Sequence, residues 1–575
     1  MLVMHTLRAA LLVSCALSLS ATARAQPRVV IDATQDRGAV RRDVFGGDLE
    51  FINSNIPAVS ALAAELPLLR FPGGDADAIF RWDQGLAPRC ARDGFDWEAA
   101  AGVALRGRAG MFLETNLVRT SPESAAMWVQ DATRRGIRVA WVGIGNEPWG
   151  DWDAGYRTAA RYAADVVAHA AAIRARVPGT RIVLAIGTAN EEAWSREAIR
   201  RTAAVIDAVD YHYYPNHDPW AEMDPAEVVA GAEGIAPAVG RIRAMIRDEA
   251  GARAGAIQVV FGEWDGAADA PRVQKMDQLV TPRAYAMWSM ADALFYGAAV
   301  GELLTSEVAA AMFYEVQGFR FGAIPGDWCV DADTSIRRPK ALVHQLWRER
   351  FGDRLIAVTA TGVPTYTVSG PTRWDGYRGV VPYARAYASL GDGGRALRVI
   401  VTHRGATNVP ALRVELRGFE PDARASVWEV GGGGILDTNE NVRGPTDVVR
   451  IRARELAVAG ATFTLPLAPY SVTAIELRRR EPPAMDAGTA ADVAVRDGAV
   501  DRADAPMADI QVPMDDVPSS DVVVARPDVA LDDAGAEPGV PSASAGCGCA
   551  VPVGASRGAG VLVIIAWIAR GRRRR

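Results

Sequence analysis

The chain has 575 residues, which is too long for one ordinary domain and long enough to bury a sizeable hydrophobic core. Its formal net charge at pH 7 is −6, so there is no electrostatic case for binding nucleic acid. We therefore expect more than one domain, and we exclude partners that require a strongly basic surface.

Residues 1–25 have the pattern of a secretory signal. Arg8 is followed by an apolar run over 9–20 and then by Ala23-Arg24-Ala25, which is typical of a cleavage site. A lipoprotein cleavage box ending at Cys15 is an alternative, but the apolar run before Cys15 is too short for it. We therefore expect an exported protein.

After a short alternating strand within residues 26–40, the segment 41–352 repeats one pattern of apolar run, loop and amphipathic helix. Helices are predicted after the N-cap pair Ser121-Pro122, and over 153–176 and 282–303. The predicted strands are Val44–Glu50, Leu68–Pro72, Gly110–Asn116, Val139–Gly145, Arg181–Ile186, Ala208–His212, Ile257–Gly262 and Val308–Phe313. Eight strands alternating with helices favour an α/β fold of the (β/α)8 TIM-barrel type over an open, doubly wound sheet.

The pattern changes after the barrel segment. Residues 353–479 contain short alternating strands separated by Gly turns, which predicts a β-sandwich that the strand within 26–40 completes. Residues 480–545 are rich in Pro, Ala, Asp and Val and have almost no aromatic side chains. Such a segment cannot bury enough surface to offset its ordering entropy, so we expect a disordered acidic linker.

The last segment, 546–575, contains Cys547 and Cys549, an apolar run over 558–569, and a cluster over 570–575 that is all Arg except Gly571. The apolar run is shorter than the ~20 residues that span a bilayer comfortably. The segment resembles the C-terminal sorting tags of myxobacteria. The resemblance implies contact with a membrane, possible processing by a sortase-like enzyme, and a location at the cell surface or outer envelope. A weak membrane-seeking tail is the alternative.

Two glutamates end similar apolar runs. Glu147 follows VAWVGIGN, and Glu263 follows IQVVFG. The carboxyl ends of barrel strands meet at one face, where active sites are built, so carboxylates after the fourth and seventh strands face each other there. Paired carboxyl groups are the groups that cleave glycosidic bonds, and a separation of about 5–5.5 Å predicts retention through a covalent intermediate. A salt-bridged surface residue is the alternative for either glutamate alone.

The motifs around these glutamates resemble clan A glycoside hydrolases and, in detail, family 51, the α-L-arabinofuranosidases. The resemblance covers about residues 27–478 and rests on several separate motifs. It implies that Glu147, in GNEPW, is the acid/base and that Glu263, in GEW, is the nucleophile. It also implies that Asn146 binds the 2-hydroxyl group of the sugar.

The same resemblance implies further substrate-binding residues. FGGDLEF places Glu50 at the end of the first strand, and LRFPGGD places Arg70 near the nucleophile and Asp75 after the two glycines. VDYHYYP places His212, with Tyr214 or Tyr213, beside the carboxylates.

Two tryptophans flank the predicted catalytic residues in sequence. Trp149 and Trp264 are predicted to bind substrate by stacking on sugar faces, and a place in the hydrophobic core is the alternative for each.

Two features depart from the family pattern: the family often has another residue where this chain has Asp75, and Asn-Glu-Pro is more usual in other clan A families. The prediction is therefore an exported, retaining α-L-arabinofuranosidase that acts on arabinose-containing polysaccharides. A β-xylosidase, β-glucuronidase or endoglucanase is the alternative. The alternative from another class is a carbohydrate-binding surface protein on an inactive barrel, but a binding protein needs no acid/base pair.

Cys90 and Cys329 are the two cysteines of the globular part once Cys15 is lost with the signal. They follow the second and eighth predicted strands, which both neighbour the first strand in a closed barrel, so we predict a disulfide between them. No His, Cys and Asp set has metal-ligand spacing, and no Gly-rich segment resembles a phosphate-binding loop. We therefore expect no metal and no cofactor.

Overall fold

A computed structural model describes residues 26–480 apart from 51, 75–79, 84, 87–95, 217–223, 268–285, 319–320, 327–332, 370–375 and 441–446. The predicted signal, linker and tail, the substrate residue Asp75 and the Cys90–Cys329 disulfide lie outside the described residues. Within the part of the chain that is described, no helix is both long enough and apolar enough to cross a membrane.

Eight parallel strands close into a barrel in the order β10-β11-β2-β3-β6-β7-β8-β9. Their bounds are β2 Gly46–Asp48, β3 Leu68–Phe71, β6 Gly110–Thr115, β7 Arg138–Ile144, β8 Ile182–Ile186, β9 Ala208–Tyr213, β10 Gln258–Trp264 and β11 Ala310–Phe313. All eight correspond to the predicted strands, and the predicted (β/α)8 barrel is confirmed.

The barrel interior has an apolar layer and, above it, a polar one. Leu68, Phe112 and Ala208 belong to the apolar cluster that fills the lower part of the barrel. Because side chains on a strand alternate between faces, the residue two positions further along each strand also points inward. In these three strands that residue is Arg70, Glu114 or Asp210, and each is almost fully buried. The alternation therefore places charged groups at the carboxyl end of the barrel.

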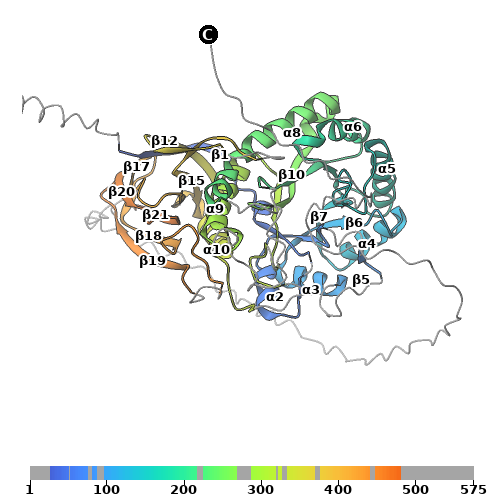
Figure 1. The fold of residues 1–575 in the computed structure, drawn as a ribbon, viewed down its shortest axis with the longest axis horizontal. Helices are drawn as coiled ribbons and strands as arrows, with labels where there is room; N and C mark the ends of the chain where they lie inside the picture. The colour runs from blue at the N-terminus through green and yellow to red at the C-terminus, as the bar shows by residue number, and fades with distance from the viewer. Residues whose placement is uncertain are drawn as a thin grey trace, which may run out of the picture. The chain divides into compact units, whose positions relative to one another are not determined.

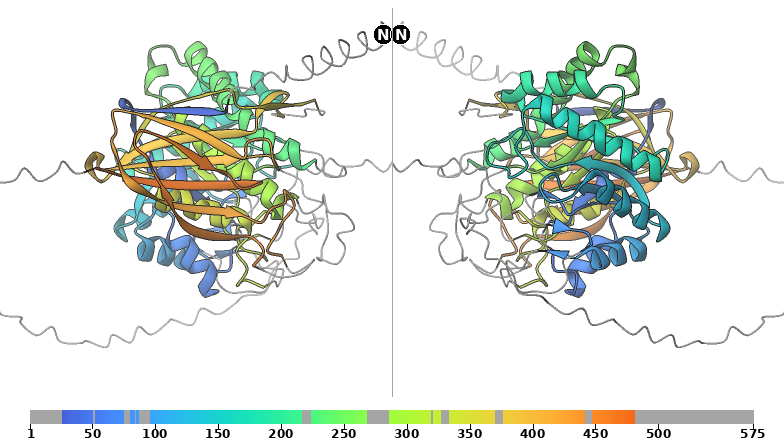
Figure 2. Two further views of the ribbon diagram at one scale, coloured as in Figure 1. Left: turned by 90° about the vertical axis from the view of Figure 1, so that its left-hand side faces the viewer. Right: turned by 90° about the vertical axis from the view of Figure 1, so that its right-hand side faces the viewer.

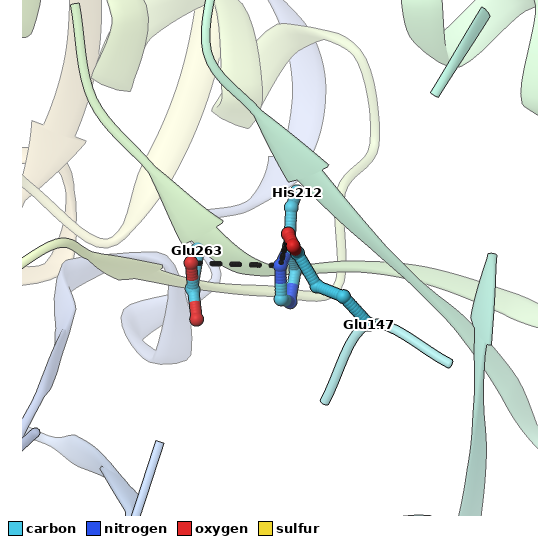
Figure 3. A group of neighbouring side chains, drawn as sticks. All are labelled: Glu147, His212 and Glu263. Atoms are coloured by element: carbon cyan, nitrogen blue, oxygen red, sulfur yellow. Dashed lines mark hydrogen bonds and ion pairs between the residues drawn. The ribbon is translucent and has the colours of Figure 1, made fainter. Parts of the chain in front are cut away.

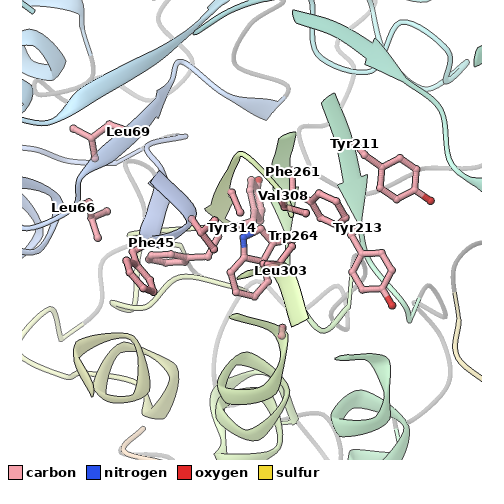
Figure 4. Close-up of a cluster of buried hydrophobic side chains, with 14 of the residues drawn as sticks. Phe45, Leu66, Leu69, Tyr211, Tyr213, Phe261, Trp264, Leu303, Val308 and Tyr314 are labelled. Atoms are coloured by element: carbon pink, nitrogen blue, oxygen red, sulfur yellow. The ribbon is translucent and has the colours of Figure 1, made fainter. Parts of the chain in front are cut away.

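Helices surround the barrel, and Figure 1 shows α4, α5, α6 and α8 beside strands β6, β7 and β10. The helices are α2 Pro57–Ala64, α3 Trp97–Gly107, α4 Pro122–Arg134, α5 Ala159–Arg176, α6 Glu192–Thr202, α7 Pro225–Ala230, α8 Ile235–Ala250, α9 Met290–Thr305 and α10 Pro339–Arg350. Short 3-10 helices are η1 Arg42–Phe45, η3 Ala189–Glu191, η4 Gly231–Gly234, η5 Gly251–Ala256 and η8 Asp392–Gly394. The outer faces of the strands pack on these helices, and Figure 4 shows a part of that core around Phe45, Phe261 and Leu303.

Two helices begin later than the sequence predicts. Helix α5 starts at Ala159 rather than at residue 153, because Thr158 accepts a hydrogen bond from the backbone N–H of Arg161 and caps the helix there. Helix α9 starts at Met290 rather than at residue 282, with Ser289 as its N-cap. The six residues released from the first helix become part of a loop that follows β7.

A second sheet has nine strands in the order β19-β18-β21-β16-β15-β12-β1-β17-β20. Their bounds are β1 Arg28–Ala39, β12 Arg354–Thr361, β15 Ala384–Gly391, β16 Ala396–His403, β17 Ala411–Arg417, β18 Pro421–Gly431, β19 Arg450–Ala457, β20 Thr462–Pro466 and β21 Ser471–Arg479. The N-terminal strand β1, blue in Figure 2, pairs antiparallel with β12 and parallel with β17. The remaining described strands form two antiparallel pairs. These are β4 Phe80–Arg81 with β5 Gly85–Leu86, and β13 Thr365–Val368 with β14 Gly379–Pro382.

The two ends of the nine-stranded sheet share one core. Val414 of β17 and Leu465 of β20 belong to the same buried cluster as Val401 of β16, Val427 of β18 and Leu477 of β21. Strands that are distant in the pairing order therefore pack face to face, which is the packing of a β-sandwich. The predicted C-terminal β-sandwich is confirmed.

Buried contacts join the barrel helices to the sandwich. The space beside Gly297 of α9 is so small that a Cβ atom there would lie 2.8 Å from Val472 of β21 and 2.9 Å from the hydroxyl of Thr402 of β16. Arg404, which follows β16, donates a hydrogen bond of 2.6 Å to Glu233 of the barrel part. The sandwich thus covers helix α9.

Candidate active site

Glu147 and Glu263 meet at the carboxyl end of the barrel, as Figure 3 shows. Glu147 lies in the loop after β7, the fourth barrel strand in chain order, and Glu263 lies in β10, the seventh. One potential ligand atom from each of Glu147, His212 and Glu263 lies within 4.8 Å of the others. The two carboxyl groups are therefore close neighbours, with an imidazole between them.

The carboxylate of Glu263 is enclosed and fully hydrogen-bonded. Oε1 accepts from Nη1 of Arg70 at 2.5 Å, and Oε2 accepts from the hydroxyl of Tyr214 at 2.7 Å. Burial alone would raise the pKa of Glu263, but the charges of His212 and Arg70 and the hydrogen bond from Tyr214 outweigh burial and lower it. Glu263 is therefore ionised at neutral pH.

Glu147 is more exposed than Glu263, with 13% of its side chain accessible against 7%. Its Oε1 lies 2.8 Å from Nδ1 of His212, and its Oε2 accepts a hydrogen bond of 2.8 Å from Nε1 of Trp152. The carboxyl group is thus oriented by two nitrogen donors and still has access to solvent.

Asp153 holds the backbone of the loop that carries Glu147. Its Oδ2 lies 3.3 Å from the backbone nitrogen of Glu147 and 3.3 Å from Nδ2 of Asn146, and its Oδ1 accepts from the backbone N–H of Gly155 at 2.5 Å. These bonds explain why residues 153–155 form a loop instead of the first turn of a helix.

His212 stands in register with Glu263 on the neighbouring strand. Its Nδ1 lies 3.5 Å from Glu263, and its Nε2 lies 3.6 Å from Asp210. Burial opposes protonation, but the negative charges of Glu263, Asp210 and Glu147 raise the pKa of His212 well above its usual value. The ring is therefore an imidazolium at neutral pH.

Arg70 is the centre of the buried network. Its side chain has no accessible surface, and each of its terminal nitrogens contacts two acceptors. Nη1 donates to Asp48 at 2.5 Å and to Glu263 at 2.5 Å. Nη2 donates to Glu114 at 2.7 Å and to Oδ1 of Asn146 at 2.8 Å. Arg70 and Asn146 are thus part of the carboxylate cluster. Asn146, in the loop after β7, also contacts Asp153 of the same loop.

Glu50 lies beside this network at the end of the first barrel strand. It is fully buried, and it accepts a hydrogen bond from the hydroxyl of Tyr314. A Cβ atom on Gly74, whose φ is +48°, would lie 1.9 Å from Oε2 of Glu50. The Pro-Gly-Gly segment therefore needs glycine because its backbone passes directly over this carboxylate.

The two tryptophans have different surroundings. Trp149 is 7% exposed and packs edge-on against Trp152, with ring centroids 5.0 Å apart. Trp264 is fully buried against Tyr296, with centroids 4.8 Å apart, and it lies in the core between the barrel and its helices (Figure 4). Trp264 therefore has the position of a core aromatic and offers no face to a sugar, unlike the substrate contact predicted from the sequence.

Several site residues were missed by sequence reasoning. They are Asp48, Glu114, Trp152, Asp153 and Tyr314. A signal existed for two of them, because Asp48 and Glu114 are charged residues within otherwise buried strands at the inward-pointing positions. For Trp152 and Asp153, the contacts to Glu147 depend on the path of a loop, which local sequence does not indicate.

Within the described residues, Glu147, His212 and Glu263 are also the group whose geometry could hold a metal ion. His212 bonds Glu147 and lies 3.5 Å from Glu263, while Trp152 donates to Glu147, and Arg70 and Tyr214 donate to Glu263. The arrangement explains the close approach of the two carboxyl groups without an ion.

Comparison with known proteins finds similarity in structure alone. No protein-family model and no curated protein sequence matches the chain. An α-L-arabinofuranosidase from Thermotoga maritima in complex with arabinose matches with a TM-score of 0.66 and 20% identity, over 79% of this chain and 100% of that chain. A family 51 arabinofuranosidase from Xanthomonas axonopodis pv. citri has a TM-score of 0.62 and 16% identity, with 79% and 100% covered.

A more distant match is a xyloglucanase of glycoside hydrolase family 44 from Paenibacillus polymyxa. Its TM-score is 0.55 at 10% identity, over 79% of this chain and 99% of that chain. The chain therefore has the fold of these glycoside hydrolases, a (β/α)8 barrel with an attached β-sandwich.

Proposed function

We propose that this protein is a retaining glycoside hydrolase in which Glu263 is the nucleophile and Glu147 is the acid/base. The observation that carries the proposal is the separation of the two carboxyl groups, whose oxygens lie within 4.8 Å of each other. Retaining enzymes place these groups about 5–5.5 Å apart, whereas inverting enzymes need about 6.5–9.5 Å to admit a water molecule.

The surroundings of each carboxyl group support its role. Glu263 is anionic, buried, and fixed by Arg70 and Tyr214, so its oxygens are held in one position for attack. Glu147 is the more accessible of the pair, which suits a group that meets both a leaving group and, later, a water molecule. The proton in the bond between His212 and Glu147 can supply the acid form.

The reaction would follow in two displacements. First, an oxygen of Glu263 bonds to the anomeric carbon while the bond to the leaving oxygen breaks and Glu147 gives that oxygen its proton. Then Glu147 takes a proton from water, the water oxygen bonds to the anomeric carbon, and the ester bond to Glu263 breaks. Two inversions give net retention, and Glu147 regains its proton.

For the sugar, we propose a terminal α-L-arabinofuranosyl residue. The structural neighbours that are named arabinofuranosidases support this, as do the sequence motifs around Glu50, Arg70 and Glu147. The family 44 match, a xyloglucanase, keeps a β-glucan substrate of the xyloglucan type as the second candidate. An inactive binding protein is disfavoured, because such a protein has no need for both glutamates and the residues that orient them.

A panel of 4-nitrophenyl glycosides tests the substrate. The panel holds the α-L-arabinofuranoside, the β-xyloside, the β-glucoside and the β-glucuronide, and a β-1,4-glucan is assayed beside them. We expect the α-L-arabinofuranoside to have the highest kcat/KM. A preference for the β-xyloside or the glucan would overturn the arabinofuranosidase assignment and leave the retaining mechanism standing. No turnover of any member would support a binding protein instead.

We further propose that the protein is exported and tethered to the envelope through residues 546–575, on the sequence features of the signal and the tail. Protein ending at residue 480 should then be soluble and active, while the full chain should fractionate with the envelope. Full-length protein found free in the medium with its Arg cluster intact would contradict the tether.

A further inference from the structure

One buried carboxyl group of the active-site network has no part in the two displacements. Glu114 is the penultimate residue of strand β6 and pairs with Arg70, and its side chain is 1% exposed. Its Oε1 accepts a hydrogen bond of 2.7 Å from Arg70, whereas its Oε2 has no hydrogen-bond partner among the described residues. A buried carboxylate oxygen without a donor is costly, so the ionisation state of Glu114 needs an explanation.

The charges around Glu114 do not balance if every group is ionised. Arg70 alone contacts three carboxyl groups, from strands β2, β6 and β10. The other charged and titratable groups that face Glu114 are His212 and Asp210 on β9 and Tyr162 on α5. Besides Glu114, the cations Arg70 and His212 contact the carboxyl groups of Asp48, Asp210, Glu147 and Glu263 in the described part of the chain. Excess negative charge of this kind is relieved when a carboxyl group binds a proton.

We propose that Glu114 holds a proton at neutral pH and acts as a neutral positioning residue for Arg70, so that the guanidinium charge serves Glu263 and Asp48. Glu114 is the carboxyl group best placed to carry the proton. Asp48 accepts donors on both oxygens, at 2.5 Å from Arg70 and 2.7 Å from the backbone N–H of Glu50, whereas Oε2 of Glu114 accepts none among the described residues. Burial, only partly offset by Arg70 and His212, raises the pKa of Glu114 to about 8, and burial raises that of Asp48 less far, to about 7.

The proton has a consequence for the nucleophile. If Glu114 were ionised, it would compete with Glu263 for the hydrogen bonds and the charge of Arg70. A neutral Glu114 still accepts from Nη2 and fixes the guanidinium plane, but it leaves the positive charge beside Glu263. The effect on activity rests on the proposed function, whereas the protonation of Glu114 does not.

Thermal unfolding tests the protonation directly. The folded-state pKa of Glu114 is raised from 4.5 to about 8, so the stability it contributes is complete below about pH 4.5 and is lost as pH rises to about 8. The amide of Glu114→Gln does not titrate. The Tm of Glu114→Gln relative to wild type should therefore rise from about pH 5 to about pH 8 and then stay level. Glu123→Gln, an exposed position on α4, is the control and should follow the wild-type curve.

An ionised Glu114 would give a different dependence of Tm on pH. If Glu114 is ionised and paired with Arg70, Glu114→Gln should be less stable than wild type by an amount that does not diminish as pH rises. That outcome, or a curve parallel to wild type, overturns the proposal. The measurement needs no enzymatic activity, so it decides the protonation even if the proposed function fails.

Kinetics test the positioning role. The acid limb of kcat/KM reports Glu263 in the free enzyme. With a neutral Glu114, the Gln variant should keep this limb at the wild-type pH, while Glu114→Leu, which lacks the acceptor, should lose about tenfold or more in kcat. A shift of the limb in Glu114→Gln to lower pH by about one unit would show that a negative charge had been removed beside Arg70, and would overturn the proposal.

Discussion

The hydroxyl of Tyr214 donates a hydrogen bond of 2.7 Å to Oε2 of Glu263, whereas the hydroxyl of the adjacent Tyr213 points away and bonds the carbonyl of Gly231 at 2.6 Å. The side chains of Tyr213, the last residue of strand β9, and of Tyr214, which follows it, therefore point in opposite directions. The sequence motif VDYHYYP leaves both tyrosines as candidates, and the alternation of side chains along the strand separates them.

Replacing Tyr214 by Phe should move the acid limb of kcat/KM to higher pH. The hydrogen bond from Tyr214 helps to lower the pKa of Glu263, so its loss raises that pKa. The expected shift is about 0.5–1 unit, because a hydrogen bond to a charged group contributes about 1.5–3 kcal/mol and water replaces part of it. Tyr213→Phe is the matched control and should leave the limb in place. An unshifted limb in Tyr214→Phe would contradict the role given to this bond.

Replacing Glu147 by Ala should affect substrates according to their leaving groups. Natural glycosides need a proton on the departing oxygen and should lose about 10²–10⁴-fold in kcat. An aryl glycoside with a strongly acidic phenol needs no proton to leave, so its first step should be spared. The comparison is made with pre-steady-state rates, since the second step also uses Glu147. Equal losses for both classes of substrate in the first step would show that Glu147 is not the acid.

A second buried charge cluster lies at the end of strand β10, which carries Glu263, and it should control stability. Nζ of Lys340 contacts Asp265 at 2.6 Å and Asp292 at 3.4 Å, and all three side chains are at most 2% exposed. Lys340 also donates to the carbonyl of Tyr314 at 3.1 Å. Burial and the charge of Asp292 raise the pKa of Asp265 well above its usual value, so a proton is already held in this cluster.

Lys340→Met should therefore lower the free energy of unfolding by about 3–5 kcal/mol, because it leaves buried carboxyl groups without their cation. Arg200→Met removes an exposed partner of Glu249 and should cost less than about 1 kcal/mol. Adding Asp265→Asn to Lys340→Met should restore part of the loss. Denaturant unfolding measures all four proteins. A loss for Lys340→Met as small as that for Arg200→Met would contradict the account.

Much of the fold follows from local sequence. Each barrel strand is an apolar run bounded by glycine, proline or a polar residue. A continuous apolar run is the pattern expected of a parallel strand that is buried on both faces. The start of α5 could not be predicted in the same way. The segment from Asp153 to Gly155 has helix-compatible residues, but the carboxylate of Asp153 bonds the backbone of Glu147 and Gly155 and keeps the segment in a loop.

The residues of the candidate site that lie in sequence motifs could be predicted. Glu147, Glu263, Arg70, His212 and Tyr214 are brought together by the strand ends that the sequence indicates. Trp264 is different, because it follows Glu263 directly and the alternation of the strand turns it outward into the core. Adjacency in sequence to a predicted catalytic residue is therefore a poor guide to a site position within a strand.

The central claim, that Glu263 is the nucleophile of a retaining enzyme, is tested most directly by chemical rescue of Glu263→Ala. The variant should lose at least about 10³-fold in kcat on every glycoside. Azide should restore turnover of an activated α-L-arabinofuranoside by attacking from the face that the carboxylate has vacated, so the product should be the glycosyl azide of inverted configuration, which ¹H NMR identifies. Turnover by Glu263→Ala near the wild-type rate, or a rescued product with retained configuration, would contradict the claim.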